Sequence, residues 1–187
     1  MNACADGVDR PFTVLVLCTG NSARSIMAEV LINRLGHPRV RACSAGSRPT
    51  GIVNPHALVQ LRASGFDVDG LRSKHWDEFA TTSAPPIDLV VTVCANAASE
   101  TCPLWPGAPQ TVHWGLPDPA AASPLEISAA FADAFAILGQ RISGWLGDSP
   151  ADAGRKGLLQ AARRMELALL AAPQPPAIDT AAWRRRI

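Results

Sequence analysis

Residues 14–25 read Val-Leu-Val-Leu-Cys-Thr-Gly-Asn-Ser-Ala-Arg-Ser, and this stretch decides which fold the chain can take. The four apolar residues predict a buried strand that ends at Cys18, and Arg24 and Ser25 stand at the expected start of a helix. A short loop between a strand and a helix can turn its backbone N–H groups inward and bind a tetrahedral oxyanion. Arg24 adds a planar set of donors that matches two oxygens of such an anion.

Cys18 is therefore a candidate nucleophile, although a buried structural cysteine at a strand end is the alternative. We expect the positive field of the loop and Arg24 to lower the pKa of Cys18 and to hold it as the attacking thiolate. The anion would be bound by six loop residues, namely Thr19, Gly20, Asn21, Ser22, Ala23 and Arg24.

The spacing of Cys18 and Arg24 also occurs between Cys4 and Arg10, so the bare pattern is weak evidence. Cys4 follows no apolar run, its loop carries two aspartates, and Pro11 disfavours a helix at Arg10. We interpret Cys4 as an incidental thiol in an N-terminal tail.

The composition limits the classes of protein to which this chain can belong. The chain has 187 residues, five cysteines without a framework spacing and a net charge of +1. We see no secretory signal and no apolar run long enough for a membrane span, and the cysteine usage suggests a reducing compartment such as the cytoplasm. The small net charge predicts no nucleic-acid partner, and the oligomeric state stays open.

Strand and helix patterns alternate along the chain. Strands are expected near 12–17, 40–44, 89–93 and 111–114, and helices at 23–35, at about 54–65 and after a capping box at Ser123–Glu126. This order predicts an α/β fold with a doubly wound, four-stranded parallel sheet and flanking helices, in which ligands bind beyond the carboxyl ends of the strands.

The chain divides by composition into three parts. We expect a tail at 1–11, a catalytic domain at 12–147 and a basic, partly helical C-terminal extension at 148–187. In the extension, apolar residues including Leu158, Ala162 and Leu169 fit one helix face. A helix docked on the domain or a partly ordered extension is the simplest interpretation, and a dimer contact or a weak anchor to an acidic surface is the alternative.

Two further cysteines suggest redox chemistry. Cys94 ends the strand near 89–93, so it should emerge at the same sheet edge as Cys18, and Cys102 follows eight residues later. In a straight helix the Cα atoms of Cys94 and Cys102 would be about 12 Å apart, whereas a disulfide needs about 7 Å or less. A disulfide between them would therefore require the segment to unwind. Two inert buried thiols are the alternative.

Asp118 precedes Pro119 on a loop after the last expected strand. A carboxyl group near the same edge is a candidate proton donor to a leaving oxygen. An Asp-Pro pair is by itself usually a turn, so its place in the chain carries the argument.

Together these motifs resemble the arsenate reductases built on the low-molecular-weight protein tyrosine phosphatase fold. The resemblance covers about residues 12–147 and rests on the Cys18–Ser25 loop, the Ser44-Ala45-Gly46 turn, Asn54-Pro55, the Cys94/Cys102 pair and the stretch from Trp114-Gly115 to Asp118-Pro119. It implies reduction of arsenate to arsenite for arsenic detoxification.

The resemblance also implies a mechanism. Cys18 would attack arsenic with Ser25 hydrogen-bonded to its thiolate, and Asp118 would protonate the departing oxygen. Cys94 would then attack Cys18 and release arsenite, and Cys102 would attack Cys94 to form a Cys94–Cys102 disulfide. Thioredoxin, or glutaredoxin with glutathione, would reduce that disulfide, and no cofactor would be bound.

Two positions depart from the family pattern. Ala23 stands where related loops often carry a second cysteine. Lys74 stands where some relatives have an acid that helps to hold potassium, and its ammonium group could replace the metal's charge. We therefore predict no required metal.

Two other functions compete with the reductase. A low-molecular-weight protein tyrosine phosphatase would use Cys18, Arg24 and Asp118 to hydrolyse phosphate monoesters, but it needs no Cys94/Cys102 pair and usually lines its entrance with aromatic side chains. This chain has no tyrosine. An oxyanion sensor or binding subunit is the third possibility, although binding alone needs no nucleophilic thiol.

Overall fold

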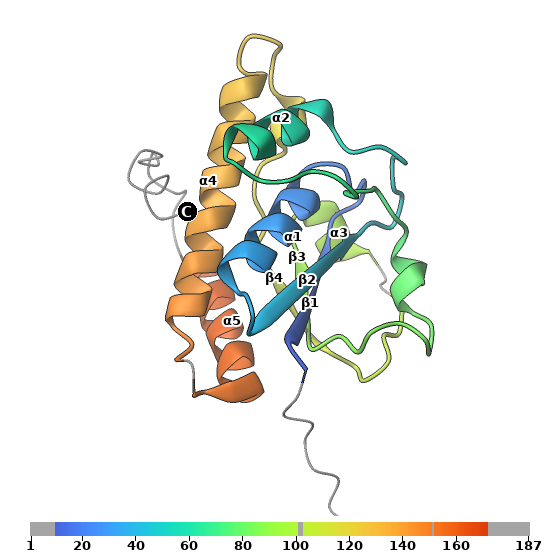
Figure 1. The fold of residues 1–187 in the computed structure, drawn as a ribbon, viewed down its shortest axis with the longest axis vertical. Coiled ribbons are helices and arrows are strands. Elements are labelled where there is room, and N and C mark those ends of the chain that lie inside the picture. The colour runs from blue at the N-terminus through green and yellow to red at the C-terminus, as the bar shows by residue number, and fades with distance from the viewer. Residues whose placement is uncertain (1–9, 101–102, 151, 172–187) are drawn as a thin grey trace, which may run out of the picture.

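The sheet has four parallel strands, as predicted (Figure 1). The computed structural model describes residues 10–100, 103–150 and 152–171, so Cys4 and Cys102 lie outside the described residues. The strands are β1 (Phe12–Leu17), β2 (Val40–Ala45), β3 (Leu89–Thr92) and β4 (Gln110–His113). Their order in the sheet is β2-β1-β3-β4, which makes β4 an edge strand.

Helices connect the strands. The α-helices are α1 (Arg24–Leu35), α2 (Pro55–Ala63), α3 (Ala95–Ser99), α4 (Ile127–Gly147) and α5 (Gly154–Ala171), and two short 3-10 helices are η1 (Trp76–Phe79) and η2 (Pro119–Ala121). Asn54 caps α2 by accepting a hydrogen bond from the His56 backbone N–H at 2.9 Å, and Pro55 opens the helix as predicted.

The sheet separates two apolar clusters. All six residues of β1 are buried, and their side chains alternate between the two faces. Val14 and Val16 belong to the larger cluster, together with apolar side chains of α1, α4 and α5. Leu15 and Leu17 belong to a smaller cluster on the other face, which is covered by η1 and by the loop that carries Trp105 rather than by long helices (Figure 1).

Parallel pairing brings the carboxyl ends of two strands together. Leu17 at the end of β1 pairs with Thr92 at the end of β3. Cys18 and Cys94 follow these two residues by one and two positions. Both cysteines therefore leave the sheet at one edge, as the sequence predicts.

The start of α4 corrects one prediction. Ser123–Glu126 was expected to form a capping box, but α4 begins at Ile127 and has no side-chain cap. The Ser123 hydroxyl donates to the Glu126 carboxylate at 2.6 Å, and residues 124–126 form a turn. The predicted apolar face is otherwise present, since Phe131, Phe135, Leu138, Ile142 and Trp145 are all buried.

The C-terminal helix α5 packs beside the edge strand. Its residues Leu158, Ala161 and Ala162 are buried in the larger cluster, and the Trp145 indole N–H donates to the Leu158 carbonyl at 2.9 Å. Glu166 is also buried, and its carboxylate accepts a hydrogen bond of 2.7 Å from the backbone N–H of His113. The helix thus satisfies a strand-edge donor that would otherwise face solvent.

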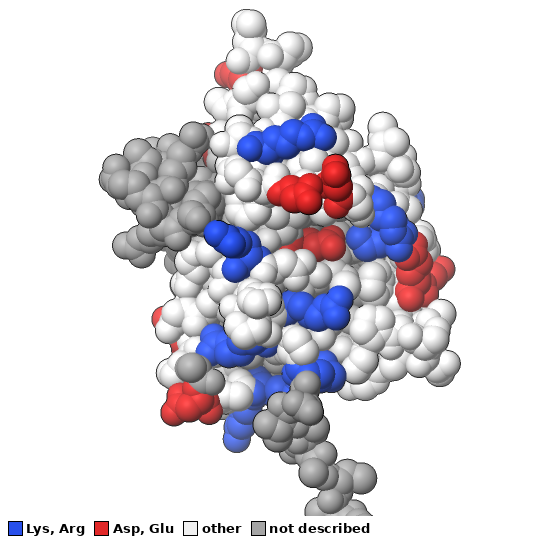
Figure 2. Space-filling model, viewed as in Figure 1, with Lys and Arg blue, Asp and Glu red and all other residues white. Residues whose placement is uncertain are grey.

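The surface carries both signs of charge. Figure 2 shows Asp and Glu side chains among the Lys and Arg side chains of the face that it draws. Arg72 and Glu78 form an exposed ion pair with 2.5 Å between Nη2 and Oε2. Within the described residues, none of the helices combines the length and apolar character needed to cross a membrane.

Candidate active site

The loop after β1 holds its carbonyl groups outward. The carbonyls of Thr19, Gly20 and Ser22 accept hydrogen bonds from backbone N–H groups of segment 48–54 at 2.9, 3.0 and 2.8 Å. At its far end the loop runs into α1, whose N-terminus has no side-chain cap. With its carbonyls held outside, the loop can turn N–H groups toward its centre, as an anion site requires.

Gly46 allows the close approach of this loop to the end of β2. A Cβ atom at position 46 would lie 2.4 Å from the Thr19 carbonyl oxygen and 2.8 Å from that of Cys18. Any larger residue would push the loop away. Gly46, directly after β2, is therefore a structural requirement of the loop.

The sulfur of Cys18 accepts hydrogen bonds inside the loop. The Asn21 backbone N–H donates to Sγ at 3.2 Å, and the Ser25 hydroxyl lies 2.9 Å away. Burial raises the pKa of the Cys18 thiol above its ordinary value, and the hydrogen bonds from Ser25 and Asn21 offset this only in part. The prediction that the loop lowers this pKa is wrong for the free protein.

Arg24 and Asp118 are paired with each other. The Nη2 atom of Arg24 lies 2.9 Å from Oδ2 of Asp118, and Nη1 donates to the Leu116 carbonyl at 3.1 Å. Asp118 also caps η2 by accepting from the Ala120 N–H at 3.1 Å. The guanidinium charge is thus directed at the Asp118 loop rather than at the sulfur of Cys18.

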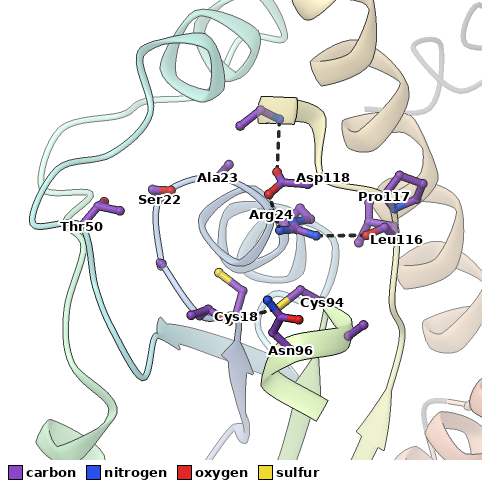
Figure 3. A pocket seen from close by; sticks show the side chains of 14 residues that line it. Cys18, Ser22, Ala23, Arg24, Thr50, Cys94, Asn96, Leu116, Pro117 and Asp118 are labelled. Atoms are coloured by element: carbon purple, nitrogen blue, oxygen red, sulfur yellow. Dashed lines mark hydrogen bonds and ion pairs between the residues drawn. The ribbon is translucent and has the colours of Figure 1, made fainter. Parts of the chain in front are cut away.

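These groups surround one pocket of about 510 Å³. Figure 3 shows Arg24 and Asp118 together at one wall, Cys94 and Asn96 along another, and Thr50 apart from them. The lining residues are Cys18, Thr19, Gly20, Ser22, Ala23, Arg24, Thr50, Cys94, Ala95, Asn96, Leu116, Pro117, Asp118 and Ala120.

The second thiol of the pocket is Cys94, which is buried and free. Its Sγ lies 3.7 Å from the Thr19 hydroxyl and caps α3 by accepting from the Ala97 N–H at 3.4 Å. The helix α3 ends at Ser99, so no helix runs unbroken from Cys94 to Cys102. Cys102 itself lies outside the described residues.

Asn21 supports the loop from behind rather than lining the pocket. It is fully buried with φ of 40°, and its side-chain oxygen accepts from the Lys74 backbone N–H at 2.8 Å. Its amide nitrogen then donates to the hydroxyls of Ser25 and Ser44 at 2.9 and 2.8 Å. Because Ser25 accepts from Asn21, its own proton is free to donate to Cys18.

This buried polar network ends at a charge pair. The Ser44 hydroxyl donates to Glu29 at 2.5 Å, and the Lys74 ammonium lies 3.5 Å from the same carboxylate oxygen. Glu29 was not predicted from the sequence, although an acid on the largely apolar helix α1 is a signal that it has a buried partner.

The structure thus brings Cys18, Arg24, Cys94 and Asp118 to one pocket, with Ser25 beneath the nucleophile. Among described residues, no group of three or more His, Cys, Asp or Glu side chains is placed to hold a metal ion. The pocket-lining residues Thr50 and Asn96 were also missed, because neither belongs to a recognisable motif.

This chain is similar in sequence to known proteins. The sequence pattern described as low molecular weight phosphotyrosine protein phosphatase matches residues 13–156. The arsenate reductase of Bacillus licheniformis is 38% identical over 114 residues, which are 61% of this chain and 78% of that protein.

Solved structures agree with the sequence comparison. An arsenate reductase from Archaeoglobus fulgidus superposes with a TM-score of 0.55 at 26% identity, covering 72% of this chain and 98% of the other. The tyrosine phosphatase Wzb of Escherichia coli K30, in complex with sulphate, gives a TM-score of 0.59 at 23% identity and coverages of 73% and 96%, a likeness of fold. With its cysteine loop, parallel sheet and matched sequence pattern, the chain belongs to the low molecular weight phosphotyrosine protein phosphatase family.

Proposed function

We propose that this protein reduces arsenate to arsenite by a relay of cysteine thiols. The observation that carries the proposal is the second free thiol, Cys94, in the wall of the pocket that holds Cys18. Hydrolysis of a phosphate ester needs the nucleophile, Arg24 and an acid, but it has no use for a second thiol. The similarity to curated arsenate reductases supports the same conclusion.

In the first step the Cys18 thiolate attacks arsenic. Arg24 and the loop N–H groups hold the arsenate oxygens, and a sulfur–arsenic bond forms while an arsenic–oxygen bond breaks. The departing hydroxyl takes a proton from Asp118 and leaves as water. Ser25 stabilises the thiolate by donating its hydroxyl proton to the sulfur.

In the second step the Cys94 thiolate attacks the sulfur of Cys18. The sulfur–arsenic bond breaks, and its electron pair goes to arsenic, which is reduced from the +5 to the +3 state and leaves as arsenite. Two thiols have then become a Cys18–Cys94 disulfide, so the two electrons are accounted for.

In the third step the Cys102 thiolate attacks Cys94 and releases Cys18 as a thiolate. An external dithiol, thioredoxin or glutaredoxin with glutathione, reduces the resulting Cys94–Cys102 disulfide. The cycle needs reduced thiols between turnovers, which suits the cytoplasm, where disulfides rarely persist.

The pocket also favours a small inorganic anion over an aryl phosphate. None of the described residues that line it is aromatic, so none of them offers an aromatic ring to stack on a phenol. The phosphatase reaction is therefore expected only as a side activity.

The test is arsenate-dependent NADPH oxidation, run with thioredoxin and thioredoxin reductase and again with glutathione, glutaredoxin and glutathione reductase. Turnover in either system supports the proposal and identifies the reductant. No turnover in both, together with hydrolysis of an aryl phosphate, would favour the phosphatase function.

The relay itself is tested by Cys94→Ser, with Cys43→Ser as the matched control because Cys43 lies in β2 outside the pocket. We expect C94S to abolish repeated arsenate turnover and to spare any phosphatase activity, and C43S to retain both. Loss of both activities in a folded C94S protein would count against the relay.

A further inference from the structure

The segment from Trp114 to Asp118, here called the acid loop, carries the proposed proton donor. It leaves the sheet at the end of the edge strand β4, so its carbonyl groups cannot all find partners in a neighbouring strand. Side chains from two helices supply the missing donors.

Arg141 of α4 holds the first part of the acid loop. Its Nη1 atom donates to the carbonyls of Trp114 and Gly115 at 2.8 and 2.9 Å. Arg141 is partly buried, and within the described part of the chain no carboxylate lies within ion-pair distance of it. Its cationic hydrogen bonds are therefore directed to the acid loop alone.

Arg24 holds the next carbonyl, that of Leu116, but it has a second task. The same guanidinium lines the pocket and would turn its donors to a bound oxyanion. Arg141 does not line the pocket, so its two bonds can persist when the anion enters.

The rest of the acid loop is conformationally restricted, so the anchoring by Arg141 also limits the movement of Asp118. A Cβ atom at Gly115 would lie 2.2 Å from Nε2 of the His113 side chain, so a larger residue there would have to displace that imidazole. Pro117 and Pro119 fix their φ angles on both sides of Asp118. The indole of Trp114 is buried against Trp145 with ring centroids 5.5 Å apart.

We propose that Arg141 is a positioning residue that keeps the carboxyl group of Asp118 in place for proton transfer while Arg24 engages the oxyanion. This inference deepens the proposed function and rests on it. Misplacing a catalytic group by about 1 Å can cost on the order of a hundredfold in rate, which gives the scale of the expected effect.

The test is a double-mutant cycle with Arg141→Met, Asp118→Asn and the two combined. The rate constant to follow is kcat/KM for arsenate, because it includes every step up to the first irreversible one. We expect R141M to lower kcat/KM about 10- to 100-fold in the parent and less than twofold in the D118N background. The inhibition constant for sulfate should change less than twofold, because R141M leaves the loop after β1, which would bind the anion, intact.

The matched control is Arg39→Met. Arg39 also donates to two backbone carbonyls, those of Ser149 and Leu146 at 2.9 and 3.4 Å, but at the far end of α4. R39M should lose a similar amount of thermal stability with less than a twofold change in kcat/KM. Arg141→Lys, which keeps one cationic donor, should retain an intermediate rate and covers the case in which R141M fails to fold.

The outcomes separate the two proposals. Equal effects of R141M and R39M, or an undiminished effect of R141M in the D118N background, would overturn the role of Arg141. If the parent protein hydrolyses phenyl phosphate but does not reduce arsenate, the proposed reductase function is overturned. The same double-mutant cycle, measured with phenyl phosphate as substrate, would still decide the role of Arg141. A parent inactive on both would overturn both.

Discussion

Arg24 and Asp118 neutralise each other at one wall of the pocket in the free protein, with 2.9 Å between Nη2 and Oδ2. The two groups that should act on an arsenate ion are thus occupied with one another. An entering anion competes with Asp118 for the guanidinium, and the carboxyl then loses its cation and gains an anionic neighbour. The carboxyl is thereby released from Arg24 beside the bound oxyanion, where a proton donor is required.

Asp118→Asn should therefore bind oxyanions more tightly while turning over more slowly. Removing the competing carboxylate frees Arg24, but the pair is partly exposed, so we expect only about a two- to fivefold gain in sulfate affinity. The loss of the proton donor should lower kcat/KM for arsenate about 10²- to 10⁴-fold. Calorimetric titration with sulfate checks the first effect, and unchanged or weaker binding would contradict it.

Ser25→Ala should raise the pKa of Cys18 further. Burial already raises this pKa, and the Ser25 hydrogen bond is the largest opposing effect. Without it the thiolate fraction at neutral pH falls, and alkylation of Cys18 by iodoacetamide should slow and shift its midpoint to higher pH. Mass spectrometry of the Cys18 peptide gives the rate, and Cys43 in the same sample is the internal control. A midpoint that stays in place would refute the role of Ser25.

Lys74→Met should destabilise the fold by about 1–3 kcal/mol, because it leaves the half-buried carboxylate of Glu29 without its ammonium partner. Urea denaturation measures the loss.

Because Lys74 supplies a positive charge beside Glu29, the parent protein should show equal stability and equal turnover in potassium and sodium chloride. A rise in parent turnover with potassium but not with sodium would show that a metal ion is required after all.

Asp88→Asn should weaken the attachment of α5 and of Arg10 to the domain in a pH-dependent manner. Burial favours the neutral carboxyl, but bonds from Arg10, the Thr13 N–H and Arg155 outweigh it and lower the pKa of Asp88. A lowered pKa stabilises the fold above the ordinary aspartate pKa, and this contribution is lost as pH falls through the folded value. We expect D88N to cost about 1–3 kcal/mol at pH 7 and to match the parent in strong acid. Urea denaturation at a series of pH values tests this, and a difference that persists in acid would contradict it.

Local patterns were sufficient to predict much of the fold. The apolar run of β1 and the spaced apolar face of α4 each indicate a structure by themselves, and both are present. The prediction of a capping box at Ser123–Glu126 was wrong because residues 124–126 form a turn instead of the first turn of the helix. The local sequence pattern is compatible with both structures and does not decide between them.

Properties that depend on distant residues were not predictable. The pKa of Cys18 depends on how deeply the folded chain buries it, and the loop motif alone suggests the opposite direction. Arg141 meets the acid loop from 26 positions away, and Glu166 lies within an apolar helix face that gives no hint of the His113 N–H opposite it. Asn21 belongs to the motif, but its side chain turns to the core.

The cover that α5 provides for β4 has a consequence for how the protein behaves in concentrated solution. An uncovered edge strand is a template for pairing with a strand of another copy, and here the apolar residues around Leu158 would be uncovered with it. Cleavage of the chain between α4 and α5, followed by release of the helix, would create both features at once. The cover of this strand edge thus depends on a helix that contributes no described side chain to the pocket.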